Sequence, residues 1–158
     1  MKRLLTLLLA LLLALAAPLC ALAQESIELW AEDYPIEEDG AYTDMEEVAV
    51  YLATYGCLPP NFITKAEARD LGWDSREGNL YLVAPGRTIG GDRFGNYEGL
   101  LPHEKGRGWT ECDVNDPEGS FRGAERLVFS NDGLIYYTAD HYESFSEVVV
   151  ILALQNAA

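Results

Sequence analysis

The C-terminal half of the chain alternates short apolar runs with turn signals, and this pattern restricts the possible folds more than any other feature. The runs 127–129 and 134–137 flank Asn131-Asp132-Gly133, which is typical of a β-hairpin turn. Residues 109–114 alternate in polarity as a half-buried strand does, and residues 145–154 form a last apolar run. These segments together predict an antiparallel sheet.

Two helices are expected before the sheet. The capping-box pattern Thr43-Asp44-Met45-Glu46 precedes apolar residues at helical spacing, and Gly56 is a good helix end. Thr64-Lys65-Ala66-Glu67 repeats the capping pattern and begins a short helix that ends at Leu71-Gly72. Lys65 then lies in the first turn, where the helix dipole disfavours a cation. We expect either that something negative binds there or that the lysine simply reaches solvent.

The first 23 residues predict a secretory signal peptide. Lys2 and Arg3 precede an apolar run over 4–19, and Ala21-Leu22-Ala23 supplies a small-x-small cleavage pattern. The mature chain would begin at Gln24, which predicts a secreted protein without stable membrane association. A retained membrane anchor, or a lipid anchor on Cys20, is the less favoured alternative.

The chain is strongly acidic, and its acidic residues are unevenly distributed. Loss of Lys2 and Arg3 leaves 9 basic against 26 acidic residues, a net charge of −17. The acidic residues concentrate at the start: residues 24–47 hold ten acids and no Lys or Arg, whereas the chain from Val48 onward has a net charge of −7. Residues 24–41 therefore predict an acidic linker or pro-segment. A sharper hypothesis is that residues 24–40 form a decoy that occupies a cationic groove.

Two cysteines remain after signal cleavage, Cys57 and Cys112. In an exported domain they suggest one disulfide, which would stabilise the fold by roughly 3–5 kcal/mol. Two separate buried thiols are the alternative.

Candidate acid–base residues lie on the predicted strands. Trp109, Glu111 and Asp113 would share one face of their strand, and Arg122 and Arg126, with Ala124 between them, would share a face of the next one. His141 follows the hairpin. An acid, a base and cations can move a proton to and from a phosphate ester, although each such residue alone is more often part of a structural ion pair. The sequence has no metal-ligand spacing and no nucleophile elbow, so we expect no metal and no cofactor.

Residues 94–99 form a glycine-bracketed loop with an aromatic residue, an amide and a carboxylate. It is either a plain surface loop or a base pocket. In the second case Phe94 would stack on a base, and Glu98 would accept hydrogen bonds from the N1–H and amino groups of guanine.

Segments along residues 42–149 resemble the barnase-like microbial ribonucleases, a secreted family that prefers guanine. They include Tyr51-Leu52-Ala53-Thr54-Tyr55, Ile63-Thr64-Lys65, Leu71-Gly72-Trp73, Ile89-Gly90-Gly91-Asp92, Glu98-Gly99, Phe121-Arg122 and Thr138-Ala139-Asp140-His141-Tyr142. The resemblance implies an α+β fold in which N-terminal helices pack on a twisted antiparallel β-sheet. It leaves 150–158 as a tail that extends the last strand.

The resemblance also implies roles for individual residues. Glu111 matches the general base and His141 the general acid of a reaction that cleaves single-stranded RNA through a 2′,3′-cyclic phosphate. The other implied positions are the phosphate-site cations Lys65, Arg122 and Arg126, the guanine loop Phe94, Asn96, Tyr97 and Glu98, the cleft aromatic Tyr142, and Asp92, which supports the cations.

The chain departs from the family type at several positions. Tyr97 stands where the family has an arginine in the base loop, Gly133 replaces a tryptophan and Ala124 replaces a serine. The loss of the arginine is expected to weaken a phosphate contact and binding to a barstar-like inhibitor. We expect a monomer. The alternatives are a non-catalytic ribonuclease-like binding module and an exported antibacterial toxin.

Overall fold

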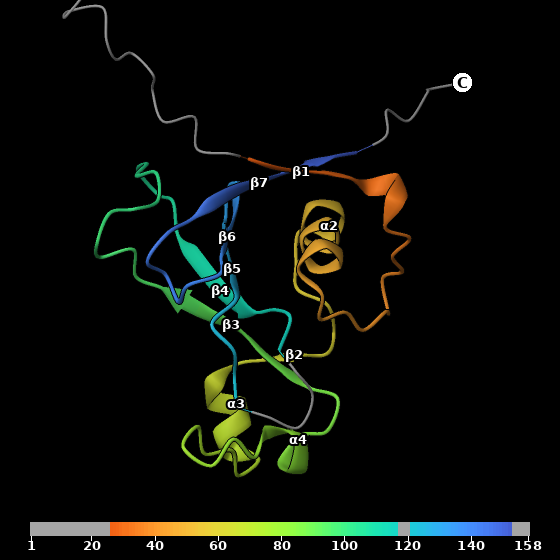
Figure 1. Ribbon diagram of the computed structural model, residues 1–158, viewed down its shortest axis with the longest axis vertical. Coiled ribbons are helices and arrows are strands. Elements are labelled where there is room, and N and C mark those ends of the chain that lie inside the picture. The colour runs from red at the N-terminus through yellow and green to blue at the C-terminus, as the bar shows by residue number, and fades with distance from the viewer. Residues whose placement is uncertain (1–25, 117–120, 153–158) are drawn as a thin grey trace, which may run out of the picture.

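The computed structural model describes residues 26–116 and 121–152, which form a seven-stranded sheet with a helix packed against one face (Figure 1). The strand order is β1-β7-β6-β5-β4-β3-β2. Strands β3 to β7 pair antiparallel, while β1 and β2 pair parallel at the two edges. The predicted α+β class is therefore confirmed. The elements are β1 (Ile27–Trp30), the 3-10 turn η1 (Ala31–Asp33), α2 (Met45–Tyr55), β2 (Phe62–Ile63), α3 (Lys65–Asp70), α4 (Leu80–Val83), β3 (Thr88–Phe94), β4 (Trp109–Asp113), β5 (Arg126–Ser130), β6 (Ile135–Thr138) and β7 (Ser146–Ile151).

The two main helices begin by different means. The predicted capping box of α3 is present, because the side chains of Thr64 and Glu67 each accept from the backbone of the other. The capping box predicted for α2 is wrong: its N-cap is Asp44, which makes no side-chain cap hydrogen bond. Instead, Met45 N–H donates to Asn115 Oδ1 at 2.9 Å. The helix start is therefore fixed by the loop after β4.

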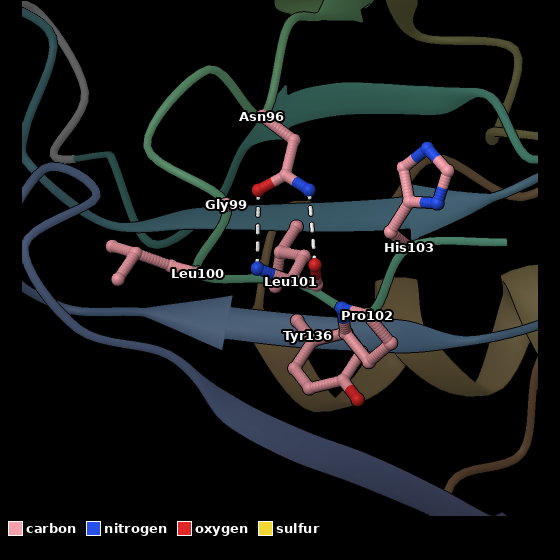
Figure 2. A pocket seen from close by; sticks show the side chains of 7 residues that line it. All are labelled: Asn96, Gly99, Leu100, Leu101, Pro102, His103 and Tyr136. Carbon is pink, nitrogen blue, oxygen red and sulfur yellow. Dashed lines mark hydrogen bonds between the residues drawn. The ribbon is translucent and has the colours of Figure 1, made fainter.

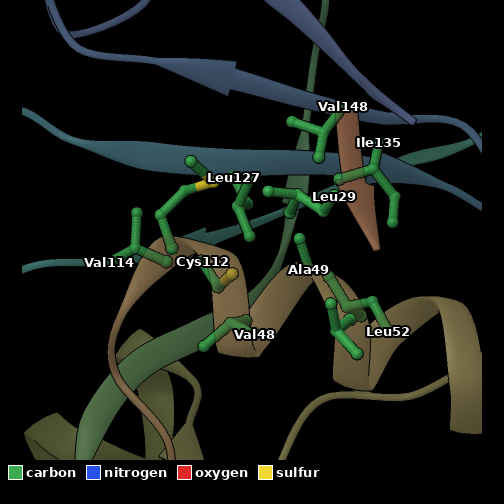
Figure 3. Packing of buried hydrophobic residues seen from close by; sticks show 11 residues of the cluster. Leu29, Val48, Ala49, Leu52, Cys112, Val114, Leu127, Ile135 and Val148 are labelled. Carbon is green, nitrogen blue, oxygen red and sulfur yellow. The ribbon is translucent and has the colours of Figure 1, made fainter. Parts of the chain in front are cut away.

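The main core lies between α2 and one face of the sheet (Figure 3). Alternate residues of the central strands point into it, which agrees with the period of two in the sequence. Its buried members are Leu29, Met45, Val48, Ala49, Val50, Leu52, Cys112, Val114, Leu127, Ile135 and Val148.

The N-terminal segment departs from the prediction. We expected residues 24–41 to be a linker, but residues 27–30 form β1, which extends the sheet beyond β7, and Leu29 is buried in the main core. The chain then passes along the outer side of α2 (Figure 1), where Tyr51 Oη donates to Glu38 O at 2.6 Å. The linker prediction is wrong for these residues because their apolar side chains complete the core. The decoy hypothesis fails with it, since the segment packs on the α2 side of the sheet.

The predicted disulfide is also wrong. Cys57 is exposed just after α2, Cys112 is buried in the main core, and both are free thiols. Burial raises the pKa of the Cys112 thiol well above its ordinary value, with the Asp113 charge adding to the effect. The two side chains lie in different environments, one in solvent and one among apolar groups.

The ends of the chain are described in part. Val150 and Ile151 extend β7, as expected, whereas residues 153–158 and the predicted signal peptide over 1–23 lie outside the described residues. Among the helices that the structure describes, none has the length and apolar character needed to cross a bilayer.

Candidate active site

Glu111 lies at the centre of the site. It is on β4 but points to the face opposite Cys112, and it is only 8% exposed. Lys65 Nζ forms an ion pair with one carboxylate oxygen, and Tyr142 Oη donates to the other at 2.6 Å. A buried carboxylate with two donors is held in one orientation while each oxygen keeps a lone pair that can accept a proton.

Lys65 is positioned by the start of α3. Its backbone N–H donates to Asp92 Oδ2 at 2.9 Å, so an acidic side chain from β3 occupies the helix N-terminus. These contacts explain how a cation is tolerated in the first helical turn, because the Asp92 and Glu111 carboxylates both lie beside it. Among the described residues, Asp92 forms no ion pair with a side chain, so its support of the cations acts through the Lys65 backbone.

The two arginines are held by a carboxylate that we did not predict as a site residue. Asp113 is 1% exposed, Arg122 forms a two-pronged ion pair with it, and Arg126 Nε lies 2.8 Å from its Oδ1. The expectation that Arg122, Ala124 and Arg126 share a strand face is wrong, because β5 begins at Arg126. Arg122 comes from the preceding loop instead, with its guanidinium 5.8 Å from the Trp73 ring centre.

The Asp113 cluster changes the electrostatics around it. Burial alone would lower the pKa of Arg122, but the hydrogen bonds and charge of Asp113 outweigh it and raise that pKa. Nearby, burial followed by the negative charge of Asp113 raises the pKa of Asp116 to about 6. Arg126 Nε is buried and makes no hydrogen bond of good geometry, so its ion pair with Asp113 is incomplete. The cations are thus already partnered by carboxylates.

His141 and Tyr142 lie in a turn after β6. Both have left-handed backbones, with φ of +57° and +76°. Side chains hold this strained turn: Tyr142 N–H donates to Thr138 Oγ1, and Asp140 accepts from Thr138 and from Ser144. The hydrogen bonds from Ser144 and Thr138 lower the pKa of Asp140 to about 2.

Tyr142 connects the two predicted catalytic groups. Its ring centre is 4.9 Å from that of His141, and its hydroxyl bonds Glu111. Burial, followed by the hydrogen bond to Glu111, raises the pKa of the Tyr142 hydroxyl, whereas Arg126 acts in the opposite direction. His141 is exposed while Glu111 is buried. The structure thus brings the acid and base candidates to the same region, with the histidine on the solvent side.

The predicted base loop is closed by Asn96 (Figure 2). Asn96 Nδ2 donates to Leu101 O, and Leu101 N–H donates to Asn96 Oδ1, both at 3.0 Å. Asn96 therefore shapes the loop with its side chain. A cavity of about 370 Å³ lies beside the loop, and its lining residues are Asn96, Gly99, Leu100, Leu101, Pro102, His103 and Tyr136. Glu111 and His141 do not line it.

The aromatic residues of the loop are in different environments. The Phe94 ring packs 5.2 Å from Tyr142 and 6.0 Å from Phe145, at the edge of a second core around Trp109. Phe94 is thus half-buried, and its stacking on a base stays a prediction. Tyr97 is 94% exposed, and Glu98 is exposed without a hydrogen bond or ion pair to any residue that the structure describes.

Two supporting carboxylates were missed, although the sequence contained signals for them. Asp113 shares the strand face of Glu111, so a partner for the arginines was to be expected there. Asp140 is bracketed by Thr138 and Ser144, hydroxyl residues whose spacing is typical of a side-chain-stabilised turn.

The relationship to known proteins follows from the sequence over this same region. The model of the ribonuclease family matches residues 45–149. The chain belongs to the ribonuclease family. Its site residues from Lys65 to Tyr142 all lie within the matched segment, whereas β1 lies before it.

Named relatives agree with this assignment. The ribonuclease of Heyndrickxia coagulans is 54% identical over 101 residues, which cover 64% of this chain and 92% of the relative. That of Bacillus intermedius is 54% identical over the same share of this chain but 62% of its own length. Guanyl-specific ribonuclease St of Saccharopolyspora erythraea is 43% identical over 93 residues, 59% of this chain and 82% of the relative. The predictions of a barnase-like family and of a ribonuclease are confirmed.

A solved structure of ribonuclease Sa2 with mononucleotides was also matched, at 22% identity and a TM-score of 0.36, covering 78% of this chain and 94% of that one. Within residues 26–116 and 121–152, no three His, Cys, Asp or Glu side chains are grouped as metal ligands.

Proposed function

We propose that this ribonuclease is a secreted endonuclease that cleaves single-stranded RNA 3′ of guanine by acid–base transphosphorylation without a metal. The observation that carries the proposal is the arrangement around Tyr142, whose hydroxyl bonds the Glu111 carboxylate and whose ring neighbours His141. A fixed buried carboxylate and an exposed histidine, both in contact with Tyr142, provide one group to accept a proton and another to donate one.

In the proposed first step, Glu111 takes the proton of the RNA 2′-hydroxyl, whose oxygen attacks phosphorus. The bond from phosphorus to the 5′-oxygen breaks, and protonated His141 gives its proton to that oxygen. The product is a 2′,3′-cyclic phosphate. In the second step water attacks phosphorus, His141 takes its proton, the bond to the 2′-oxygen breaks, and Glu111 returns the proton to that oxygen.

The cations stabilise charge in this scheme. Lys65 contacts Glu111 directly, and Asp113, two residues further along β4, holds Arg122 and Arg126 through ion pairs. Attack by the 2′-oxygen adds negative charge to the phosphate as it becomes a phosphorane. Lys65, Arg122 and Arg126 would stabilise that added charge. Asp113 and Asp92 would keep these cations in place while the substrate is absent.

Guanine preference would come from Glu98. Its exposed carboxylate can accept two hydrogen bonds from the N1–H and amino groups of guanine, and adenine lacks that pair of donors on this edge. Support comes from the exposure of Glu98 on a loop that Asn96 closes, and from the guanyl-specific relative.

The proposal is tested with the dinucleotides GpA and ApA, incubated with EDTA and examined for the cyclic phosphate. We expect cleavage of GpA with a guanosine 2′,3′-cyclic phosphate product, and loss of that cleavage in Glu111→Gln. Absence of cleavage in the wild type would instead favour a non-catalytic binding module. Inhibition by EDTA would contradict the metal-free scheme.

Secretion, a monomeric state and an inhibitor are parts of the same proposal. A mature protein recovered from the medium with Gln24 at its N-terminus would support signal cleavage, and light scattering would give its mass. A barstar-like inhibitor would have to bind through the local field of the cleft, since the mature chain carries −17 overall.

A further inference from the structure

We infer that Asp116 is a positioning residue that sets the charge of the arginine site, so that this ribonuclease binds the RNA phosphate more tightly in mildly acidic than in neutral solution. The arginine site consists of Arg122, Arg126 and the Asp113 carboxylate that holds them. The inference rests on the proposed function, because it assigns a pH-dependent control to the same phosphate-binding cations.

The first observation is the place of Asp116 in the fold. Its Oδ1 accepts a hydrogen bond from the Gly123 N–H at 2.6 Å, so the carboxylate is fixed beside the backbone of the residue that follows Arg122. A Cβ added to Gly123 would lie 3.0 Å from the same oxygen, so glycine permits this close approach. Asp116 is therefore held next to the arginine site by a backbone contact.

The second observation is the balance of charge at the arginine site. The guanidinium groups of Arg122 and Arg126 are matched by the carboxylates of Asp113 and Asp116 when both acids are ionised. These four side chains then offer a phosphate no net charge, whereas protonation of Asp116 leaves one net positive charge. Among the described residues Asp113 makes both ion pairs and Asp116 makes none, so Asp116 can lose its charge without breaking an ion pair.

The groups that face Asp116 come from β4, β5 and the loop between them. Burial raises its pKa, and the negative charge and hydrogen bond of Asp113 on β4 act in the same direction. The Gly123 N–H and the charge of Arg126 on β5 oppose them, and the result is a pKa of about 6. Arg122 faces Asp116 from the loop, since the charge of Asp116 helps to raise the Arg122 pKa. Asp116 thus changes its charge in mildly acidic solution.

Proton binding and phosphate binding are therefore linked. Because the arginines hold the phosphate, its affinity should be higher when Asp116 is protonated, and bound phosphate should raise the proton affinity of Asp116 by the same factor. Coupling of this kind typically changes affinity by about 5- to 150-fold, and the lower end applies to a half-buried group that solvent partly screens. The effect levels off once Asp116 is ionised, whereas deprotonation of a required acid such as His141 continues to lower the rate at every higher pH.

The test measures the binding of sulfate, an anion whose charge is constant over the pH range used. Since a histidine also changes charge between about pH 5 and 8, the parent protein for this measurement is His141→Gln. Its Kd for sulfate, measured by calorimetry at constant ionic strength, should rise about 5-fold between about pH 5 and about pH 7.5.

Two variants of that parent assign the effect. Asp116→Asn removes the charge and keeps an oxygen for the Gly123 N–H, so it should bind sulfate as the parent does at about pH 5 and about 5-fold more tightly at about pH 7.5. Asp39→Asn is the matched control, because Asp39 is exposed in the segment along α2 and its substitution changes the net charge equally. This control should keep the pH dependence of the parent.

The outcomes separate this inference from the proposed function. The inference would be overturned by parallel pH curves for the parent and Asp116→Asn, by a curve that Asp39→Asn flattens equally, or by no binding of sulfate at about pH 5. Weaker binding in Asp116→Asn at both ends of the range would also overturn it, because the loop contact would then have a structural role only. Failure of the wild type to cleave GpA would instead overturn the proposed function, whatever the sulfate result.

Discussion

The two faces of the sheet are built from alternate residues of the same strands, yet they bury different chemistry. On the α2 face, Cys112 and Leu127 pack with apolar side chains alone. On the other face, their chain neighbours Glu111, Asp113 and Arg126 are also buried, but Glu111 is ion-paired with Lys65 and Asp113 with Arg126. The first face gains stability from removing apolar area from water, whereas the second bears the desolvation of charges.

The two faces should therefore respond differently to substitution. Changes on the α2 face should lower the free energy of unfolding and leave kcat/KM of the folded protein alone. Changes at Glu111 or His141 should lower kcat/KM and leave the free energy of unfolding nearly unchanged. Changes at Asp113 should lower both quantities.

The largest effect is expected for the acid–base pair. Glu111→Gln and His141→Gln should each lower kcat/KM roughly 10²–10⁴-fold while the folded structure persists, because the shape and hydrogen-bonding capacity of the side chains are largely kept. Steady-state kinetics and thermal unfolding of the same preparations measure the two properties. Glu77→Gln, at an exposed position, is the matched control and should behave as wild type. If the loss of activity only reflected a loss of folded protein, the proposed difference between the two faces would be contradicted.

Asp113 tests whether the buried charges also support the fold. Asp113→Asn leaves the Arg126 guanidinium, which is 2% exposed, without its anion. The unfolding free energy should fall by about 3–5 kcal/mol, and activity should fall as well. The control is Asp132→Asn, which breaks the surface pair with Arg107 and should lower the unfolding free energy much less, because solvent screens that pair. Equal costs in urea unfolding would show that burial does not distinguish the two pairs.

Truncation on the α2 face should affect stability alone. Leu127→Ala should cost about 2–5 kcal/mol in chemical unfolding, with kcat/KM unchanged under folding conditions. Leu29→Ala tests the added strand β1 and should cost about 2 kcal/mol, because that side chain is 6% exposed. Val149→Ala, 40% exposed on β7, should stay within about 0.5 kcal/mol. A neutral Leu29→Ala would mean that β1 is dispensable.

The smallest effect concerns pH. Asp116 has a pKa raised to about 6, so the folded protein binds its proton more tightly than the unfolded chain does. Its contribution to the unfolding free energy should therefore fall as pH rises from about 4 to about 6. The amplitude should be no more than about 1 kcal/mol because the group is partly exposed to solvent. Urea unfolding across this range should flatten in Asp116→Asn, and an unchanged slope would contradict the assignment.

Much of this organisation was predictable because local rules and tertiary packing agree. The hairpin turn at Asn131–Gly133 and the capping box at Thr64 are local signals, and the structure confirms them. The alternation over 109–114 correctly indicated a strand, but β4 is buried on both faces and not half-buried. The resemblance added the family, and the structure brings Lys65 and Tyr142 to Glu111.

The remainder depends on contacts that are distant in sequence. β1 forms because Leu29 and its neighbours complete a core contributed by residues about 100 positions away, and nothing within residues 24–41 indicates that core. The disulfide prediction was wrong because the sequence gives the number of cysteines but not the directions of their side chains. The position of Arg122 depends on Asp113 across a loop, and the packing of Phe94 depends on Tyr142.

The acid–base assignment is tested most directly by the pH dependence of kcat/KM for GpA in wild type, Glu111→Gln and His141→Gln. The wild type should give a bell-shaped profile, since one group must be deprotonated and the other protonated. Glu111→Gln should lose the acidic limb and His141→Gln the alkaline limb. A profile that keeps both limbs in both variants would contradict the assignment of the base to Glu111 and the acid to His141.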